Sequence, residues 1–263
     1  MALEKTEAVI LKMFNWSESS RTVVFFTRKF GKMALIDRGG RSLKSKRGRL
    51  LRFARLDLTL YNSQKETSGY ISDVEALRVF SLEKDGGLGR LAYGSAACEL
   101  LYILLPESEQ QSSLYSYLLS YLEKLEQVDK KYLPALFLTF LLRVMSQLGY
   151  HPSLAFCAGC SRNWADIPQD SGKLLFSAQR GGLVCPSCQK PGEYYIGLSA
   201  GDVKSLSVLQ RASLDEAAAV PMGYQGATFL IETLADFLKF HSGLLSELKS
   251  LEFLEKLKNT QLM

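Results

Sequence analysis

The sequence lacks the features of a secreted or membrane-spanning protein. Its most apolar stretch, Tyr132–Leu142, holds only eleven uncharged residues before Arg143, and a helix of that length cannot cross a bilayer. The N-terminal MALEKTEAVILK carries two acidic residues before any apolar run develops, which argues against a secretory signal. We therefore expect a cytoplasmic protein without membrane contact, in a reducing compartment where thiols stay free to bind metal.

Motifs for catalysis are also missing. The chain has two histidines, His151 and His241, which leaves little scope for acid–base chemistry, and it contains no phosphate-binding loop and no G-x-S-x-G motif. The glycine-rich DGGLGRLAYG, residues 85–94, lacks a preceding buried strand and a lysine, so we interpret it as a linker. We predict a protein without enzymatic activity.

Acidic residues are scarce where basic residues are most frequent. Residues 1–80 hold 16 Lys/Arg and 8 Asp/Glu, a net charge of +8, whereas the whole chain has a net charge of +5. Arg38–Arg55 alone contains eight Lys/Arg and no acid. Leu50, Phe53 and Leu56 continue this stretch into a strand-like run, which argues against a disordered tail. A solvated surface is the alternative, but such charge density favours contact with a polyanion.

The pattern of apolar residues divides the chain into β and α parts. Short runs rich in β-branched and aromatic residues predict strands at 7–14, 21–28, 31–38, 54–62 and 68–80. Five short strands separated by tight turns suit a small closed barrel. Helical periodicity follows over 90–105, 113–127 and 133–148, and again after residue 198, where Ser199 and Asp202 suggest a capping box. We expect 211–223 to be a loop, followed by two amphipathic helices over 224–243 and 244–258.

Four of the five cysteines form two C-x-x-C pairs, CAGC and CPSC, separated by 24 residues. Two such turns can present four thiolates to one tetrahedral metal ion, and a site closed by four sulfurs is structural because no position remains for water. KLLFSAQRGGLVC, between the pairs, predicts a hairpin in an insert without a core of its own. We therefore expect one structural Zn²⁺ per chain, bound by four ligands: Cys157, Cys160, Cys185 and Cys188. A redox dithiol and cysteines without metal are the alternatives, and Cys98 fits a small core residue.

Several blocks, in this order, resemble the bacterial recombination mediator family RecO. They are EAVILKMFNWSESSRTVVFFTRKFGKMALIDRGGRSLKSKRG, ELLYILLPE, LGYHPSLAFCAGC and FSAQRGGLVCPSC. The resemblance implies an α+β protein with an N-terminal OB-fold β-barrel, followed by an α-helical domain with a zinc-ribbon-like insert. The implied domains are 1–80 for the OB fold, 81–152 with 193–263 for the helical domain, and 153–192 for the zinc-binding insert with its four cysteines.

The resemblance further implies a non-enzymatic role in DNA repair and recombination. RecO-like proteins bind single- and double-stranded DNA, anneal complementary strands, and act with RecR and the C-terminal tail of SSB to load RecA, with a functional link to RecF. We accordingly expect a nucleoid-associated protein. The alternative is an RNA-binding or transcription-associated OB/zinc-ribbon adaptor without annealing activity. The residues expected to contact nucleic acid are Arg21, Arg28, Lys32, Arg38, Arg41, Lys44, Lys46, Arg47, Arg49 and Arg52.

Overall fold

The structure is a computed structural model, and it describes residues 2–15, 17–40, 50–62, 69–83, 87–166, 173–243, 249–250 and 252. The chain divides into two compact units. Unit 1 comprises Met1–Gln127 and Leu248–Met263, and unit 2 comprises Val128–Glu247. The three-part domain division expected from the sequence remains a prediction.

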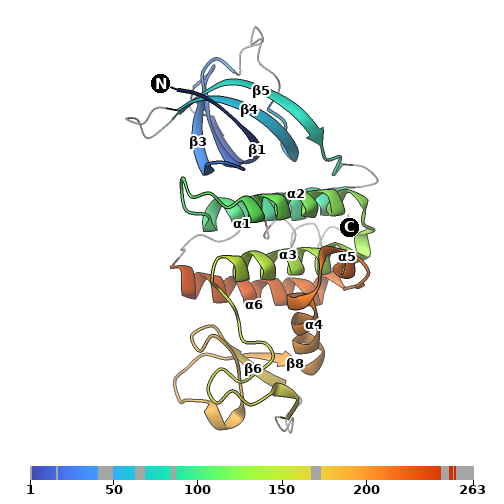
Figure 1. Cartoon of the computed structure of the whole chain (residues 1–263). Coiled ribbons are helices and arrows are strands. Elements are labelled where there is room, and N and C mark those ends of the chain that lie inside the picture. The colour runs from blue at the N-terminus through green and yellow to red at the C-terminus, as the bar shows by residue number, and fades with distance from the viewer. Residues whose placement is uncertain are drawn as a thin grey trace. The chain divides into compact units, whose positions relative to one another are not determined.

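Unit 1 begins with a closed five-stranded barrel of strand order β1-β2-β3-β5-β4 (Figure 1). The long first strand closes it, because residues 2–8 of β1 pair with β4 and residues 8–15 pair with β2. A short parallel pairing of Leu35 and Ile36 with Gly69 and Tyr70 joins β3 to β5. The predicted OB-type barrel is therefore confirmed. Its strands are β1 (Ala2–Asn15), β2 (Arg21–Thr27), β3 (Gly31–Asp37), β4 (Ala54–Asn62) and β5 (Gly69–Val79).

The alternation of residues along these strands fills the barrel interior with apolar side chains. Phe25, on β2, is completely buried there, with β-branched and leucine side chains from the other strands around it. Burial of this apolar surface provides most of the barrel's stability. The members of this core are Ala8, Ile10, Val23, Phe25, Leu35, Ala54, Leu56, Leu58, Leu60, Ile71 and Val74.

A second set of barrel residues is buried although it lies outside the interior core. Val9, Leu11, Val24 and Phe26 do not belong to the interior core, yet each is almost fully buried. The helices of unit 1 cover this outer face: α1 contacts β1, and Phe26 meets Tyr115 of α2 edge to face at 5.5 Å between ring centroids. These helices are α1 (Leu88–Leu104) and α2 (Ser112–Gln127).

Glycine at position 94 allows α1 to pack closely in unit 1. A Cβ atom there would lie 2.7 Å from Leu82 Cδ1 and 3.1 Å from Phe53 Cε1. The linker expected over residues 85–94 is thus wrong from Leu88 onward, where α1 begins, because Gly94 serves close packing of a helix. Residues 84–86 lie outside the described part of the chain.

Unit 2 is built around α3, whose side chains are buried almost all round. Helices α4, α5 and α6 contact it. The Ser199–Asp202 capping box is confirmed at the start of α4. The loop expected over 211–223 is wrong in part, because Ser213 and Glu216 form a second capping box that starts the short α5. The bounds are η1 (Lys130–Tyr132), α3 (Leu133–Gln147), α4 (Ala200–Arg211), α5 (Leu214–Ala217) and α6 (Tyr224–Ser242).

The cysteine-rich part of unit 2 forms a three-stranded antiparallel sheet of order β7-β6-β8. Its β6–β7 hairpin was predicted. Phe176 of β6 is fully buried, and its ring centroid lies 6.2 Å from that of Phe237 on α6, so the insert buries apolar surface against a helix of unit 2. The elements are η2 (Trp164–Asp166), β6 (Lys173–Ser177), β7 (Gly182–Val184), η3 (Pro186–Cys188) and β8 (Ile196–Ser199).

The C-terminal helix predicted over 244–258 falls mostly outside the described residues. Among the residues that are described, no helix combines the length and apolarity that crossing a membrane requires.

Candidate nucleic-acid interface and metal centre

Arg21 and Arg38 lie at one end of the barrel. Arg21 opens β2 and pairs in register with Asp37, the last residue of β3. Its Nε donates to Asp37 Oδ2 at 2.9 Å, and Asp37 is almost fully buried. This ion pair fixes the end of β3, from which the basic stretch continues.

Arg38 is held against an aromatic ring at the same end. Its guanidinium carbon lies 4.0 Å from the ring centroid of Tyr70, the second residue of β5, and its Nη2 donates to the Tyr70 hydroxyl at 2.6 Å. Stacking of this kind leaves guanidinium N–H groups able to donate to an anion. Tyr70 was not singled out from the sequence, because strand order alone brings β5 beside the end of β3.

Five of the predicted nucleic-acid contacts follow directly after this end of the barrel in the chain. They fall in residues 41–49, which lie outside the described residues, so their role remains a prediction. They are Arg41, Lys44, Lys46, Arg47 and Arg49.

Arg28 and Lys32 lie at the turn of the β2–β3 hairpin, whereas Arg21 lies at its open end. Seven residues of extended chain separate Arg28 from Arg21, which corresponds to about 23 Å. Lys32 Nζ donates to the carbonyl oxygen of Tyr102 on α1 at 3.0 Å, and burial lowers the pKa of Lys32. Arg28 forms an ion pair with Glu7 at 3.6 Å. Among the described residues, Arg28 and Lys32 therefore lie apart from Arg21 and Arg38.

Most aromatic residues near the basic stretch belong to the core. Phe25, Phe26 and Phe53 are buried, and Phe30 packs against the barrel core. Arg52 is exposed and lies with its guanidinium carbon 5.2 Å from the Phe53 ring centroid. None of these four phenylalanines therefore offers an open face for base stacking.

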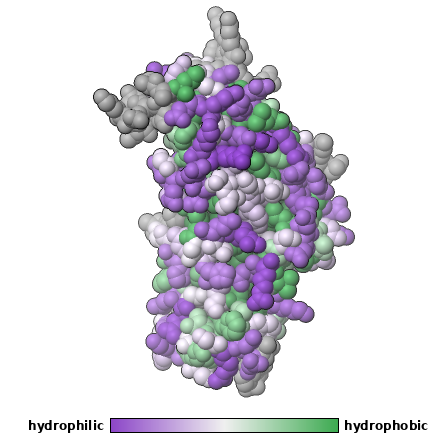
Figure 2. All heavy atoms as spheres, viewed as in Figure 1, coloured by the Kyte–Doolittle hydropathy of each residue, from purple (hydrophilic) through white to green (hydrophobic). Residues whose placement is uncertain are grey.

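Exposed aromatic residues occur elsewhere on the barrel and were missed by sequence reasoning. Phe14 on β1 is 40% exposed, and Tyr61 on β4 is 41% exposed. The bulge between Ile10 and Lys12 shifts the alternation of β1, so counting residues from the predicted strand start could not identify Phe14 as an outward residue. In Figure 2 hydrophilic side chains dominate the barrel face in view, with apolar groups scattered among them.

The four cysteines of the C-x-x-C pairs come together in unit 2. The sulfurs of Cys157, Cys160, Cys185 and Cys188 all lie within 4.8 Å of one another. The Cys160 and Cys185 sulfurs are 3.8 Å apart, which matches the edge of about 3.8 Å in a sulfur tetrahedron around a metal with bonds of about 2.3 Å. Thiolates also suit soft or borderline metal ions. The geometry and the chemistry of the donors therefore fit a tetrahedral metal site.

Backbone geometry explains how each C-x-x-C turn presents its sulfurs. Ser161 adopts a left-handed conformation with φ 59° directly after the first pair. Gly159 packs so close to the second pair that a Cβ atom would lie 2.9 Å from Cys188 Cβ. Pro186 opens the short η3 turn, which brings Cys188 N within 2.9 Å of Cys185 O. The first turn therefore depends on the small Gly159, and the second turn is started by Pro186.

Hydrogen bonds prepare the Cys157 sulfur for ionisation. Although burial opposes the charged form, N–H groups of Cys185 and Gly159, each 3.3 Å away, help lower the pKa of Cys157 to about 6. Side-chain hydrogen bonds, first from Cys185 and then from Cys160, raise the pKa of Cys188 to about 12. Cys98 lies in α1 of the other unit, where burial raises its pKa to about 12, as expected of a core residue.

A five-stranded OB barrel, a helical part and a four-cysteine ribbon define the class of the protein. The profile of the family described as "Recombination protein O N terminal" matches residues 1–80, and the profile described as "Recombination protein O C terminal" matches residues 86–252. The chain therefore belongs to the RecO family, which acts in DNA repair and recombination. The resemblance noted in the sequence is confirmed.

Individual relatives match along nearly their whole length. The DNA repair protein RecO of Symbiobacterium thermophilum is 30% identical over 263 residues, covering 99% of this chain and 100% of the relative. The protein of the same name from Desulfatibacillum aliphaticivorans is 32% identical over 262 residues, covering 96% of each chain. That of Pelobacter propionicus is 31% identical, covering 97% of this chain and 98% of the relative.

Proposed function

We propose that the chain is a non-enzymatic mediator that binds single- and double-stranded DNA and anneals complementary strands. The observation that carries the proposal is the barrel end where Arg21 and Arg38 both lie, directly before residues 41–49 in the chain. A cationic surface that contacts phosphates and makes no base-specific contacts screens the repulsion between two phosphate backbones. It leaves the base edges free to pair.

We propose that the barrel end contributes more to DNA binding than the other predicted positions. Arg38 is exposed and stacks on Tyr70, and its guanidinium carries five N–H donors in all. Arg21 is engaged with Asp37, and its contribution is mainly to position the end of β3. The ammonium group of Lys32 donates a hydrogen bond to the carbonyl oxygen of Tyr102 on α1. We expect Arg38 and the five basic residues within 41–49 to make most phosphate contacts, with Arg52 beside them in sequence.

We further propose that RecR and the C-terminal tail of SSB are partners, and that the complex loads RecA in functional connection with RecF. Binding DNA and SSB with one chain raises the effective concentration of each for the other. A cytoplasmic, nucleoid-associated location follows from such a role.

We propose that the metal is one structural Zn²⁺, bound by Cys157, Cys160, Cys185 and Cys188. When bound, it would cross-link the two C-x-x-C turns. With four sulfur ligands the metal has no open position for water, which supports a structural role for the ion in a protein without catalysis.

Charge reversal at Arg38, Arg41, Lys44 and Arg47 to Glu tests the DNA site. We expect loss of single-stranded DNA binding by fluorescence anisotropy and loss of annealing of complementary oligonucleotides, with an unchanged circular dichroism spectrum. The control is reversal of four exposed basic residues of unit 2: Lys190, Lys204, Arg211 and Lys239. If both quadruple variants lose binding equally, general charge and not the barrel end is responsible; if the first variant still anneals, the site is wrong.

Competition between DNA and RNA of matched length tests the function itself. The proposal expects DNA to be bound at least as tightly as RNA, and it expects capture of purified SSB and RecR on the immobilised protein. Strong RNA preference without capture of either partner would instead support an RNA-binding adaptor.

A further inference from the structure

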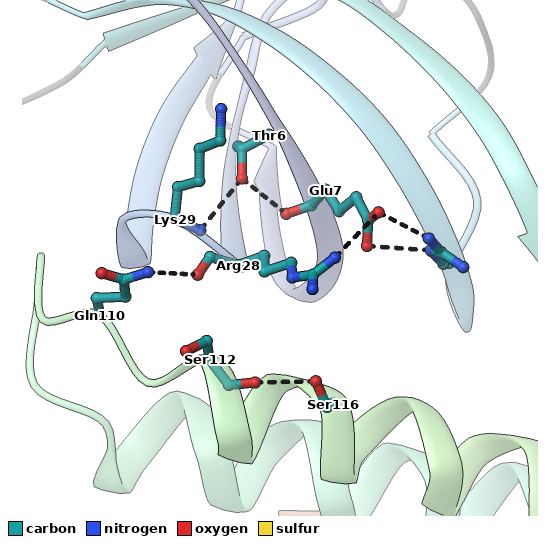
Figure 3. A network of polar contacts seen from close by, with 8 residues as sticks. Thr6, Glu7, Arg28, Lys29, Gln110, Ser112 and Ser116 are labelled. Carbon is teal, nitrogen blue, oxygen red and sulfur yellow. Dashed lines mark hydrogen bonds and ion pairs between the residues drawn. The ribbon is translucent and has the colours of Figure 1, made fainter.

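Arg28, Glu7 and Arg55 form a charged cluster on the barrel, and Figure 3 shows Glu7 with Arg28 beside it. The carboxylate of Glu7 on β1 accepts two hydrogen bonds from Arg55 on β4, from Nη2 at 2.6 Å and from Nε at 3.1 Å. Glu7 Oε1, which accepts from Arg55 Nη2, also lies 3.6 Å from Nη1 of Arg28, the residue after β2. One carboxylate therefore holds two guanidinium groups, and the cluster keeps a net charge of +1.

The backbone fixes these three residues next to one another. Arg28 N donates to Glu7 O at 2.9 Å, and the buried hydroxyl of Thr6 accepts from Lys29 N at 3.2 Å. Glu7 pairs across the β1–β4 ladder with Asp57, two residues from Arg55. The guanidinium groups thus project from a rigid sheet, whereas their side chains remain 55% exposed for Arg28 and 41% exposed for Arg55. Solvent can reach both.

The geometry of the Arg55–Glu7 pair is the one that arginine also uses for phosphate. Two parallel N–H donors of a planar guanidinium match two oxygens of either a carboxylate or a phosphate. In the free protein Glu7 occupies the position where a phosphate would sit, with a second arginine beside it.

Polar residues of α2 and the segment before it lie near this cluster, where Ser116 Oγ donates to Ser112 O at 3.0 Å. Tyr115 on α2 is almost fully buried, and its hydroxyl has no hydrogen-bond partner among the described residues. It lies within electrostatic reach of all three charged groups, since burial and then the Glu7 charge raise the pKa of Tyr115, which Arg55 and Arg28 oppose. Ser112 and Ser116 at the start of α2 lie below Arg28 in Figure 3, and Gln110 donates to Arg28 O at 3.4 Å. No acidic residue occupies the first turn of α2.

We propose that Arg28 and Arg55 form a second nucleic-acid phosphate subsite and that Glu7 is its internal competitor. A backbone phosphate displaces the Glu7 carboxylate, which turns toward solvent, and takes over its hydrogen bonds from Arg55. The inference rests on the proposed DNA-binding function. It assigns Arg55 and Glu7, which sequence reasoning left out, and it gives Arg28 a place separate from the Arg38 end.

The test measures binding of a fluorescent oligo(dT) to the full chain over a range of salt concentrations. Glu7→Gln keeps the shape but removes the competing charge. We expect affinity to rise about two- to fivefold, the factor that corresponds to a partly exposed ion pair. We expect the slope of log K against log salt to stay the same, because the unsubstituted protein and the variant make the same number of phosphate contacts.

Asp57→Asn is the matched control, because Asp57 faces Glu7 on the next strand and pairs with Lys5 at 2.6 Å instead of with either arginine. It changes the net charge of the barrel equally, and we expect no comparable gain in affinity. If the two variants gain affinity alike, the effect of Glu7 is general charge and the inference is wrong.

Arg55→Gln in the otherwise unchanged protein gives a second, independent measurement should Glu7→Gln fold poorly. We expect weaker binding and a slope of log K against log salt that is shallower by about 0.7. If Arg55 served only to connect β4 to β1 through Glu7, the slope would stay unchanged. If the unsubstituted protein binds oligo(dT) but neither variant differs from it, only this inference fails. If the unsubstituted protein binds no oligonucleotide, the proposed function fails and the inference with it.

Discussion

The barrel and the ribbon are both small β structures, but different interactions hold them together. The barrel closes its sheet on itself with five strands, and eleven buried apolar residues fill its interior in the part of the chain that the structure describes. The ribbon has three strands, of which the longest has five residues. Its sheet is open, and its two loops meet at four sulfurs.

This difference shows what each part requires in order to fold. A closed barrel is stabilised by its own apolar core and needs no metal, because every strand is paired on both sides and the core excludes water. A three-stranded sheet of such short strands has too little apolar surface for independent stability, even with Phe176 packed on Phe237. We therefore expect the barrel to respond to loss of apolar volume and the ribbon to respond to loss of metal.

Removing the proposed zinc ion should give the largest effect and should break the ribbon alone. Structural zinc contributes about 10–16 kcal/mol to folding in isolated zinc peptides. We expect Cys185→Ala, or a chelator, to bring bound zinc from one per chain to near zero and to expose residues 150–199 to proteases. Metal analysis and limited proteolysis measure the two results.

The chain provides a matched control and separate optical reporters for this experiment. Cys98→Ala removes a thiol from α1, and it should leave the metal content at one per chain. The two tryptophans are Trp16, between β1 and β2, and Trp164, in η2 of the ribbon. With Trp16→Phe, the fluorescence of Trp164 should report unfolding of the ribbon; with Trp164→Phe, Trp16 should stay unaffected by chelator. Freshly purified reduced protein without zinc would contradict the four-sulfur site.

Deleting a ring from the barrel core should give the next largest effect and spare the ribbon. Phe25 is fully buried inside the barrel, and Phe→Ala substitutions in cores cost about 3–5 kcal/mol. We expect Phe25→Ala to lower the free energy of unfolding seen by Trp16 in urea by this amount, with zinc content unchanged. Phe14→Ala, on the outside of the same barrel, should cost far less; equal losses would show that interior packing does not hold the barrel.

Local sequence patterns predicted the parts whose cause is local. Short runs rich in β-branched and aromatic residues identified all five barrel strands, and the spacing of CAGC and CPSC was enough to identify the sulfur cluster. The Ser199 capping box is likewise a relation between residues three apart. Each of these depends on neighbours in the chain, which is why composition and spacing were sufficient.

Features that depend on distant segments could not be read from the sequence. Residues 24 and 26 look like any outward strand positions, yet helices α1 and α2 bury them. Arg28 and Lys32 were predicted to contact nucleic acid together with Arg38, but the β2–β3 hairpin carries them to a different place. Strand β8 has only four residues, and its pairing with β6 makes it a strand. In each case tertiary contacts decide the outcome.

Crowding at the metal-binding turns should give an intermediate effect. In Gly159→Ala the new Cβ would lie 2.9 Å from Cys188 Cβ and 3.0 Å from its sulfur, so one C-x-x-C turn must shift. Overpacking of this kind costs about 1–3 kcal/mol. We expect zinc to be lost at a lower chelator concentration, as followed by Trp164 fluorescence. Gly226→Ala in α6 meets no atom within 4 Å and should leave zinc retention unchanged; equal zinc loss in both would argue against the crowding.

The smallest effect should come from the junction where the ribbon ends. Ser199 is both the last residue of β8 and the N-cap of α4: its Oγ accepts from Asp202 N at 3.1 Å, and Asp202 Oδ2 accepts from Ser199 N at 2.9 Å. Ser199→Ala should cost about 1 kcal/mol, the usual value for an N-cap. Ser213→Ala removes the equivalent box from α5, away from the ribbon. Both variants should keep zinc, but hydrogen exchange should accelerate in β8 only for Ser199→Ala, because there the helix cap also holds the edge of the sheet. If β8 exchanges equally in both, the metal and Phe176 are sufficient to hold the ribbon without the cap.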